Sequence, residues 1–178
     1  MKANSRKAAS VIAVALAAVL SLSSLQAQQP ESPAASWLKR LKSLEGEWKG
    51  TTPAGKPVKL SYKSIAGGSA VMEVFSFADK PDSISMYTIY HLDGEQLMLT
   101  HYCVSNNQPR MRAELPGSDP NVLRFAFVDA TNLPKPEAGH MNRAMLKVID
   151  ENHIANEWTY RKDGKDAFSE GAQYERVR

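Results

Sequence analysis

Residues 83–104 read SISMYTIYHLDGEQLMLTHYCV, two runs that alternate between apolar and polar side chains on either side of Asp93-Gly94. Alternation with a period of two is typical of a β-strand that is buried on one face. A two-residue turn containing Gly is typical of hairpins, because the primed turns need a positive φ. We therefore predict an antiparallel hairpin with strands near 83–92 and 95–104.

The position of the turn also predicts which side chains of this hairpin share a face. If Leu92 pairs with Glu95, Met86 lies opposite His101 on the neighbouring strand. This face is richer in apolar groups than the other one, so we expect it to point into the protein. The expected inward residues are Met86, Thr88, Tyr90, Leu97, Leu99, His101 and Cys103.

The chain after Trp48 repeats this alternating pattern at short intervals, with turn-forming residues between the runs. We expect strands near 46–52, 57–65, 70–78, 83–92, 95–104, 109–115, 122–129, 141–149, 153–162 and 165–177. About ten short strands with no helical crossover indicate an antiparallel meander. We predict an all-β fold in which the meander closes into an up-and-down β-barrel, because closure removes exposed edges. A two-sheet sandwich is the alternative.

One short amphipathic helix is expected before the strands. Ser32 has the character of an N-cap, with Pro33 at the first helical position, and Gly46 lies just beyond the last apolar residue. The apolar residues at helical spacing are Trp37, Leu38, Leu41 and Leu44.

The first 27 residues have the pattern of a secretory signal peptide. Three basic residues precede an apolar run over 8–20, and Leu25-Gln26-Ala27 offers a signal-peptidase site. Residues 28–36 would form a tether and residues 37–178 the barrel domain. No second long apolar stretch follows, so we expect a periplasmic or secreted protein without a membrane anchor in its mature form.

The net charge and the cysteine content limit the classes of protein to which this chain can belong. Three of the 22 Lys and Arg residues precede residue 28, whereas none of the 19 Asp and Glu residues does, so the mature chain is neutral. A neutral chain without a basic stripe is not a nucleic-acid-binding protein. The single cysteine, Cys103, cannot form an intrachain disulfide, and it does not follow the signal as a lipid-anchored cysteine would.

The segment LEGEWKG, residues 44–50, places Gly-x-Trp at the start of the first predicted strand, directly after the helix. In this respect the chain resembles the calycin barrels, the lipocalins and their relatives. It is also similar, along most of its mature length, to uncharacterised exported bacterial lipocalin-like proteins, which share Thr100–Cys103 and Asn107–Met111. The resemblance implies a barrel with an internal cavity, in which Gly46 and Trp48 have structural roles at the closed end.

Two better understood relatives differ from this chain at their ligand-binding residues. Nitrobindin-like barrels share the Gly-x-Trp opening and bind haem through a His near the chain end, but residues 171–178 contain no His. Fatty-acid-binding barrels hold a carboxylate with an Arg two residues before a Tyr, and here Ala172 precedes Tyr174. Haem binding is kept as a lesser alternative, and we expect no cofactor and no metal.

The turn after Cys103 decides whether two arginines face the interior. A four-residue turn at 105–108 pairs Cys103 with Arg110 and His101 with Arg112, which places both arginines inside. An interior arginine is costly unless it meets an anion, so this register predicts a ligand with an anionic head. A turn one residue longer or shorter directs both arginines to solvent. The inward residues are then Met111, Ala113 and Leu115.

A second hairpin is expected at Asp163-Gly164. Its register places Trp158 and Tyr160 on the inner face, opposite the small residues Ser169 and Ala167. Large side chains opposite small ones are typical of a packed interior.

Catalytic motifs are absent from the sequence, and we do not class this chain as an enzyme. Residues 67–71 lack the closing Gly of a nucleophile elbow and precede a strand, not a helix. Glu157 and Glu170 are expected to lie opposite each other on the outer face. An inward carboxylate pair, suited to acid–base work or a metal, is the alternative.

These patterns favour a protein that binds a small apolar or amphipathic molecule in a barrel cavity, gated by the loop at 130–139. The other function class left open is a packed barrel that acts as a periplasmic protein-interaction module. The predicted ligand-binding residues are His101, Cys103, Arg110, Arg112, Met86, Leu99, Trp158 and Tyr160.

Overall fold

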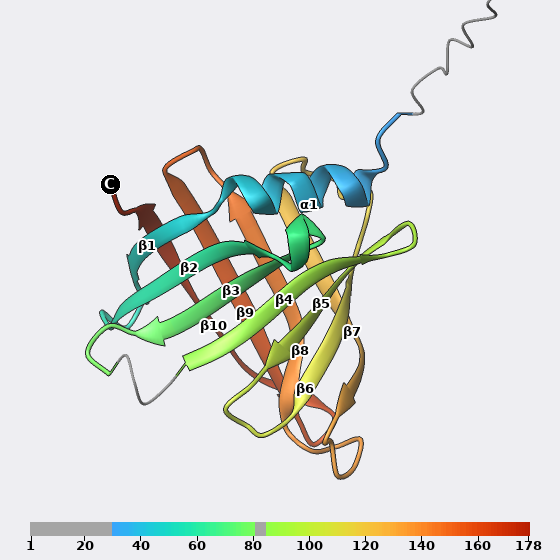
Figure 1. The fold of residues 1–178 in the computed structure, drawn as a ribbon. Helices are drawn as coiled ribbons and strands as arrows, with labels where there is room; N and C mark the ends of the chain where they lie inside the picture. The colour runs from blue at the N-terminus through green and yellow to red at the C-terminus, as the bar shows by residue number, and fades with distance from the viewer. Residues whose placement is uncertain (1–29, 81–84) are drawn as a thin grey trace, which may run out of the picture. The chain divides into compact units, whose positions relative to one another are not determined.

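The computed structural model describes residues 30–80 and 85–178. Residues 31–178 form one compact unit in which ten antiparallel strands close into a barrel, with β1 pairing with β10 (Figure 1). The predicted all-β barrel preceded by one short helix is confirmed, and the sandwich alternative is wrong. The predicted signal peptide lies outside the described residues. Within the part of the chain that the structure describes, no helix has the length and apolar character of a membrane span.

Every predicted strand is present, with ends displaced by two residues at most. The helical elements are α1 (Pro33–Ser43) and a short 3-10 helix, η1 (Ala66–Gly68). The strands are β1 (Gly46–Thr51), β2 (Pro57–Ile65), β3 (Ala70–Phe77), β4 (Ser85–Asp93), β5 (Gln96–Tyr102), β6 (Gln108–Ala113), β7 (Val122–Thr131), β8 (His140–Val148), β9 (His153–Lys162) and β10 (Lys165–Arg176).

Helix α1 begins as the sequence predicts and lies across one end of the barrel (Figure 1). The Ser32 hydroxyl accepts a hydrogen bond from the Ala35 N–H at 3.2 Å, and Pro33 is the first helical residue. The helix therefore starts within the segment 28–36 that was expected to be a tether. Its buried residues are Ala34, Trp37, Leu38 and Leu41.

At the end of the barrel that α1 covers, Trp48 is part of the buried hydrophobic core, and only 1% of its surface is exposed. The Trp48 indole N–H donates to the Leu44 carbonyl at 2.9 Å. The Arg176 guanidinium lies 4.2 Å from the centre of the same ring and donates to the carbonyls of Glu45 and Ser43 at 2.8 and 3.1 Å. These contacts join the end of α1, the start of β1 and the end of β10.

The β4–β5 hairpin has the predicted faces but not the predicted partners. Its turn is Gly94-Glu95, with φ of +55° at Gly94, so Leu92 pairs with Leu97 and Thr88 pairs with His101. A turn that begins with Gly is the II′ arrangement, in which only the first central residue needs a positive φ. The pairing is displaced by two residues, and an even displacement keeps every side chain on its expected face.

Of the two registers left open for β6, the one that points Arg110 and Arg112 into the barrel is wrong, and the alternative with Met111 inward is observed. Leu99 pairs with Met111, and Met111 is fully buried while both arginines are exposed. The turn brings Asn106 into the left-handed region at φ of +60°, and the resulting odd displacement reverses the faces. Burying an apolar Met111 in place of two unpaired cations is the favourable register.

A β-bulge changes the register of the β9–β10 hairpin. Asp163-Gly164 forms the expected two-residue turn, but Ala167 is an extra residue between the pairs of Asp166 and Phe168. Tyr160 therefore pairs with Phe168, and Trp158 pairs with Glu170. The predicted pairing with Ser169 and Ala167 is wrong, and so is the predicted Glu157–Glu170 pair. Glu157 pairs with Gly171.

Candidate functional site

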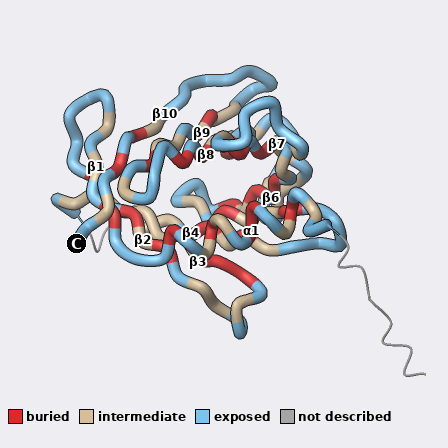
Figure 2. The backbone as a smooth tube through the Cα atoms, turned by 90° about the horizontal axis from the view of Figure 1, so that it is seen from above, coloured by how far each residue is buried: buried red, intermediate tan, exposed pale blue. Residues whose placement is uncertain are grey.

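The barrel is hollow at the end opposite α1, which we call the mouth. Connections β1–β2, β5–β6, β7–β8 and β9–β10 lie there, and buried residues alternate with more exposed ones along many of the strands (Figure 2). A cavity of about 440 Å³ opens at this end. Its apolar wall includes Phe75, Phe77, Met86, Met141, Trp158, Tyr160 and Phe168. Its polar groups include Glu73, His101, Ser105, Asn156, Glu170 and Tyr174.

Aromatic rings make up much of this wall. Phe75 and Phe77 meet edge to face with ring centres 5.3 Å apart, and Tyr160 stacks on Phe168 at 5.0 Å. The Trp158 ring lies 4.5 Å from the His101 ring at an angle of 35°. Flat faces and a small number of polar groups are typical of sites for small organic molecules.

A row of polar side chains crosses four neighbouring strands on the inner face. The strand pairs place Tyr62 of β2 beside Glu73 of β3, Glu73 beside Thr88 of β4, and Thr88 beside His101 of β5. All four side chains are buried. Thr88 Oγ1 lies 3.0 Å from His101 Nδ1, and the strand pairing places Thr88 directly beside Glu73. We call Glu73, Thr88 and His101 the interior relay.

Glu73 is a carboxyl group held inside the barrel by hydroxyl donors. The hydroxyls of Tyr62 and Tyr90 donate to its Oε2 at 2.6 and 2.9 Å. Burial raises the pKa of Glu73 above its usual value, and the hydrogen bonds from Tyr62, Tyr90 and Thr88 oppose this rise. Burial and the adjacent carboxyl raise the pKa of both tyrosines, so the tyrosines keep their protons and act as donors.

His101 is a member of the relay that lines the cavity, and one of its ring nitrogens has no partner among the described residues. Its Nε2 is buried and has no hydrogen-bond partner within the described residues. Burial lowers the pKa of His101 to about 4, so the imidazole is neutral at pH 7. A buried polar atom without a partner costs about 1–3 kcal/mol, which a suitable ligand recovers. The Tyr174 hydroxyl is a second buried cavity group with no partner at hydrogen-bonding geometry among the described residues.

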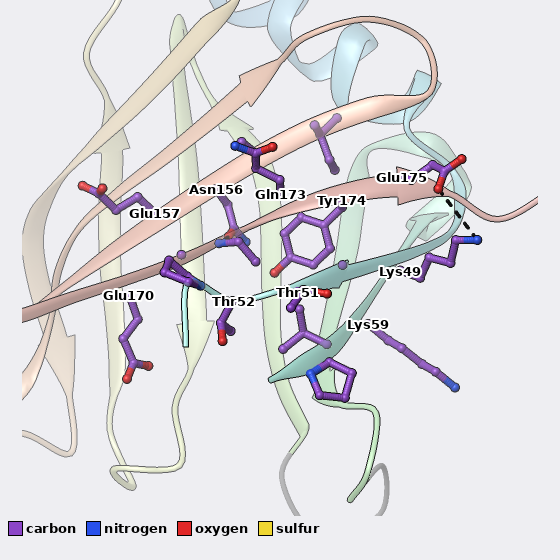
Figure 3. Close-up of a pocket in the computed structure, with 18 of the residues that line it drawn as sticks. Lys49, Thr51, Thr52, Lys59, Asn156, Glu157, Glu170, Gln173, Tyr174 and Glu175 are labelled. Carbon is purple, nitrogen blue, oxygen red and sulfur yellow. Dashed lines mark hydrogen bonds and ion pairs between the residues drawn. The ribbon is translucent and has the colours of Figure 1, made fainter. Parts of the chain in front are cut away.

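The barrel wall opens next to the cavity, between β1 and β10 (Figure 3). These strands share only four residue pairs, from Trp48 with Arg176 to Thr51 with Gln173, and β10 extends well beyond the end of β1. A shallow groove of about 1050 Å³ follows this seam. Figure 3 shows charged side chains along it, including the Lys49–Glu175 ion pair of 3.7 Å. We place the site in the smaller cavity, because the groove is open to solvent.

The cavity and the groove are adjacent, since they share several lining residues. The shared residues are Thr52, Asn156, Glu170, Gly171, Ala172 and Tyr174. The groove therefore lies directly against the wall of the cavity.

Five of the eight predicted ligand-binding residues line the cavity. They are Met86, His101, Cys103, Trp158 and Tyr160. Leu99 is fully buried in the packed core and is not among the residues of the cavity wall. Arg110 lies outside the barrel in an ion pair with Asp129, and Arg112 is exposed on the same outer face.

Several residues of the candidate site, chiefly Glu73 and Tyr174, were not predicted from the sequence. The segment 70–78 contained the signal for Glu73: Val71, Glu73, Phe75 and Phe77 share one face by alternation, so a carboxyl falls in an apolar row. Tyr174 was compared only with the anchor of fatty-acid-binding barrels. Tyr62 and Tyr90, which hold Glu73, have no distinctive local pattern.

The loop at 130–139 is hydrogen-bonded to the neighbouring turns at the mouth. The Asn107 side-chain amide donates to the Gly139 carbonyl at 2.8 Å, and the Asp163 N–H donates to the Glu137 carbonyl at 2.9 Å. None of the cavity-lining residues that the structure describes comes from residues 130–139. Gating by this loop stays a prediction.

The described cavity residues do not fit haem as nitrobindin-like barrels hold it. The last strand has no histidine, as the sequence already indicated. No Lys or Arg lines the described cavity to pair with propionate groups, and Glu170 lies at its rim. Within residues 30–80 and 85–178, no three His, Cys, Asp or Glu side chains come together at a metal-binding distance.

No protein-family model matches this chain, and no curated protein sequence matches it. Among solved structures, one similar fold is a protein of unknown function of the DUF3598 family from Nostoc punctiforme, with 12% identity and a TM-score of 0.49. It covers 77% of this chain and 49% of its own, so this chain spans about half its length.

Two further solved structures are similar. Rv2717c from M. tuberculosis has 16% identity and a TM-score of 0.48, and covers 79% of this chain and 97% of its own. EF1p2_mFAP2b, bound to DFHBI, has 12% identity and a TM-score of 0.36, and covers 82% of this chain and 99% of its own. Scores this low carry no argument about ligands, and membership of the calycins stays a prediction.

Proposed function

We propose that this protein binds one small, apolar, ring-containing molecule in the cavity at the mouth of its barrel. The observation that carries this proposal is the cavity of about 440 Å³ with aromatic walls, directly above a core that is otherwise tightly packed. Its size falls within the range of about 300–1,000 Å³ that ligand sites occupy. A barrel packed throughout would favour the protein-interaction module, and the cavity favours binding instead.

The charge of the cavity disfavours an anionic ligand. Its described lining contains two carboxyl groups, Glu73 and Glu170, and neither Lys nor Arg. The anionic head group that the arginine-inward register suggested has no cation to meet among these residues, because Arg110 and Arg112 lie outside. The predicted signal peptide adds the proposal that binding takes place in the periplasm or outside the cell.

A fluorescence titration with the neutral probe N-phenyl-1-naphthylamine tests the proposal. Met86→Trp should block the cavity, because Met86 lines it, and should weaken the probe at least tenfold. Met98→Trp is the matched control, because Met98 pairs with Arg112 on the outer face and does not line the cavity. Saturable one-to-one binding that is lost only in Met86→Trp supports the proposal. No binding by the unmodified protein, or equal binding by both variants, overturns it.

A further inference from the structure

We propose that the outer face of β3, β4 and β5 binds an amphipathic helix of a partner protein, in which acidic residues lie on both sides of the apolar stripe. This surface lies outside the cavity, so the inference does not depend on the proposed small-molecule site. Two observations support it: an uncharged apolar strip on the outside of the barrel, and a basic side chain on each side of that strip.

Six apolar side chains lie together on this outer face, and we call them the outer strip. They are Met72, Val74, Tyr87, Ile89, Met98 and Tyr102. The strand pairs place Val74 beside Tyr87, and Tyr87 beside Tyr102, on three strands that lie side by side (Figure 1). Tyr87 is 43% exposed and Tyr102 is 49% exposed. The outward positions at 72–76, 87–91 and 98–102 contain no Lys, Arg, Asp or Glu, so the strip is accessible and uncharged.

Basic side chains bound the outer strip on both sides. Met72 pairs with Lys63 of β2, and Met98 pairs with Arg112 of β6. Lys63 and Arg112 are exposed, and neither forms an ion pair within the described residues. A partner that covers the strip therefore gains most when it places carboxylates against both edges.

The dimensions of the outer strip fit a helix. Along the strip, each of the three strands already pairs with a neighbour on both sides, so no further strand can be added there. From β3 to β5 the strip is two strand spacings wide, which is about 10 Å. An α-helix with its side chains has a diameter of about 10–12 Å. One helix therefore covers the strip, and the side chains on its two flanks reach β2 and β6.

The charge pattern argues against a second copy of this chain as the partner. Packing two strips face to face about a two-fold axis would bring the basic edges of one copy against the basic edges of the other. A membrane surface fits less well, because membrane-binding faces insert apolar side chains into the lipid, whereas no residue of the strip is more than half exposed. Tyr and Met at the centre, with charges at the rim, are typical of protein–protein interfaces.

Fluorescence anisotropy with two synthetic helical peptides of about 20 residues tests the proposal. Both peptides carry the same leucine stripe, with glutamates on both sides of it in one and lysines in the other. We expect the unmodified protein to bind the glutamate peptide at least tenfold more tightly than the lysine peptide at physiological ionic strength. Equal affinities, or no binding of the glutamate peptide, would overturn the proposal.

Two charge-reversal variants locate the binding surface. Lys63→Glu combined with Arg112→Glu should reverse the preference, so that the lysine peptide binds more tightly. Lys147→Glu combined with Lys165→Glu changes the net charge equally on β8 and β10, and should keep the preference for the glutamate peptide. Equal responses of the two variants would mean that only the net charge of the protein matters, which would also overturn the proposal.

The apolar part of the surface has its own variant. Tyr87→Glu places a carboxylate in the middle of the outer strip and should weaken the glutamate peptide at least tenfold. Val177→Glu is the matched control, because Val177 is 47% exposed and lies beyond β10, away from the strip. Equal affinity in the two variants would show that the peptide binds elsewhere.

Two further measurements separate this inference from its alternatives. Binding to phosphatidylglycerol vesicles by a protein that does not bind the glutamate peptide would assign the strip to a membrane surface and overturn the proposal. All four variants should keep the affinity of the unmodified protein for N-phenyl-1-naphthylamine, because none of the substituted residues lines the cavity. A failure of the peptide experiment therefore leaves the proposed small-molecule binding untouched, and the reverse also holds.

Discussion

Thr88 Oγ1 lies 3.0 Å from His101 Nδ1, and Thr88 pairs with Glu73 on the neighbouring strand, so one threonine lies between an interior carboxyl group and an imidazole of the cavity lining. The connection crosses three strands at a single level of the barrel. A buried polar row of this kind is favourable only when its members satisfy one another. His101 Nε2, at its end, is buried and has no hydrogen-bond partner within the described residues.

Glu73 and its tyrosines should show strong coupling in stability. Glu73→Leu leaves the hydroxyls of Tyr62 and Tyr90 buried without an acceptor, which should destabilise the fold by about 2–5 kcal/mol. In the Glu73→Leu background, Tyr62→Phe should cost little or restore stability, whereas alone it should cost about 1–2 kcal/mol. Urea unfolding of the four proteins in this cycle measures the coupling. Additive effects would show that Tyr62 and Glu73 do not depend on each other.

Stability should fall on the acid side of neutrality because of His101. The pKa of its imidazole is about 4 in the folded protein, against an ordinary value of 6.5 in the unfolded chain. Between these values the unfolded chain binds a proton that the folded one does not. The free energy of unfolding should therefore decrease as the pH falls from 6.5 towards 4, by at most about 3 kcal/mol from this group.

His101→Phe should remove this contribution, so its stability should fall less steeply than that of the unmodified protein over the same pH range. Urea melts of both proteins at pH 7.5, 5.5 and 4.5 provide the comparison. The other described histidines and Glu73 are present in both proteins, so the difference between the two slopes isolates His101. Parallel pH profiles would contradict burial of a neutral imidazole.

Trp48 should contribute far more to stability than Trp158. Trp48 is 1% exposed in the packed end of the barrel, so Trp48→Ala should cost about 3–5 kcal/mol. Trp158 lines the hollow end and is partly exposed, so Trp158→Ala should cost clearly less. Urea melts monitored by circular dichroism test this order. A loss below about 1 kcal/mol for Trp48→Ala would show that this end of the barrel is not packed as described.

The outer arginines should have no part in binding at the cavity. Arg112 is exposed on the outer face of β6, beyond the wall of the cavity, so Arg112→Met should leave the affinity for N-phenyl-1-naphthylamine unchanged. A fluorescence titration of the variant beside the unmodified protein is sufficient. Weaker binding in Arg112→Met would mean that the register of β5 and β6 is wrong.

The strands and the helix could be predicted from the sequence because their signals are local. Alternation indicated the ten strands, and Ser32 with Pro33 indicated the start of α1. The inward face of β4 and β5 was also predictable, because a displacement by two residues does not exchange the faces.

The predicted strand registers were wrong where a single residue of a turn or bulge determines which residues pair and which side chains face the interior. The left-handed Asn106 turned Arg110 and Arg112 outwards, and the bulge at Ala167 moved Glu170 opposite Trp158. Neither feature has a distinctive sequence pattern. Glu73 was accessible in principle, but the two tyrosines that hold it come from β2 and β4, and only the closed barrel brings them together.

The most direct measurement of the central claim is native mass spectrometry of the protein purified, without unfolding, from the cells that produce it. We predict a one-to-one complex with a small apolar compound that is released on collisional activation. The Met86→Trp variant should be recovered without this compound, and Met98→Trp should retain it. An unmodified protein that never carries a bound molecule and does not take up N-phenyl-1-naphthylamine would contradict the account.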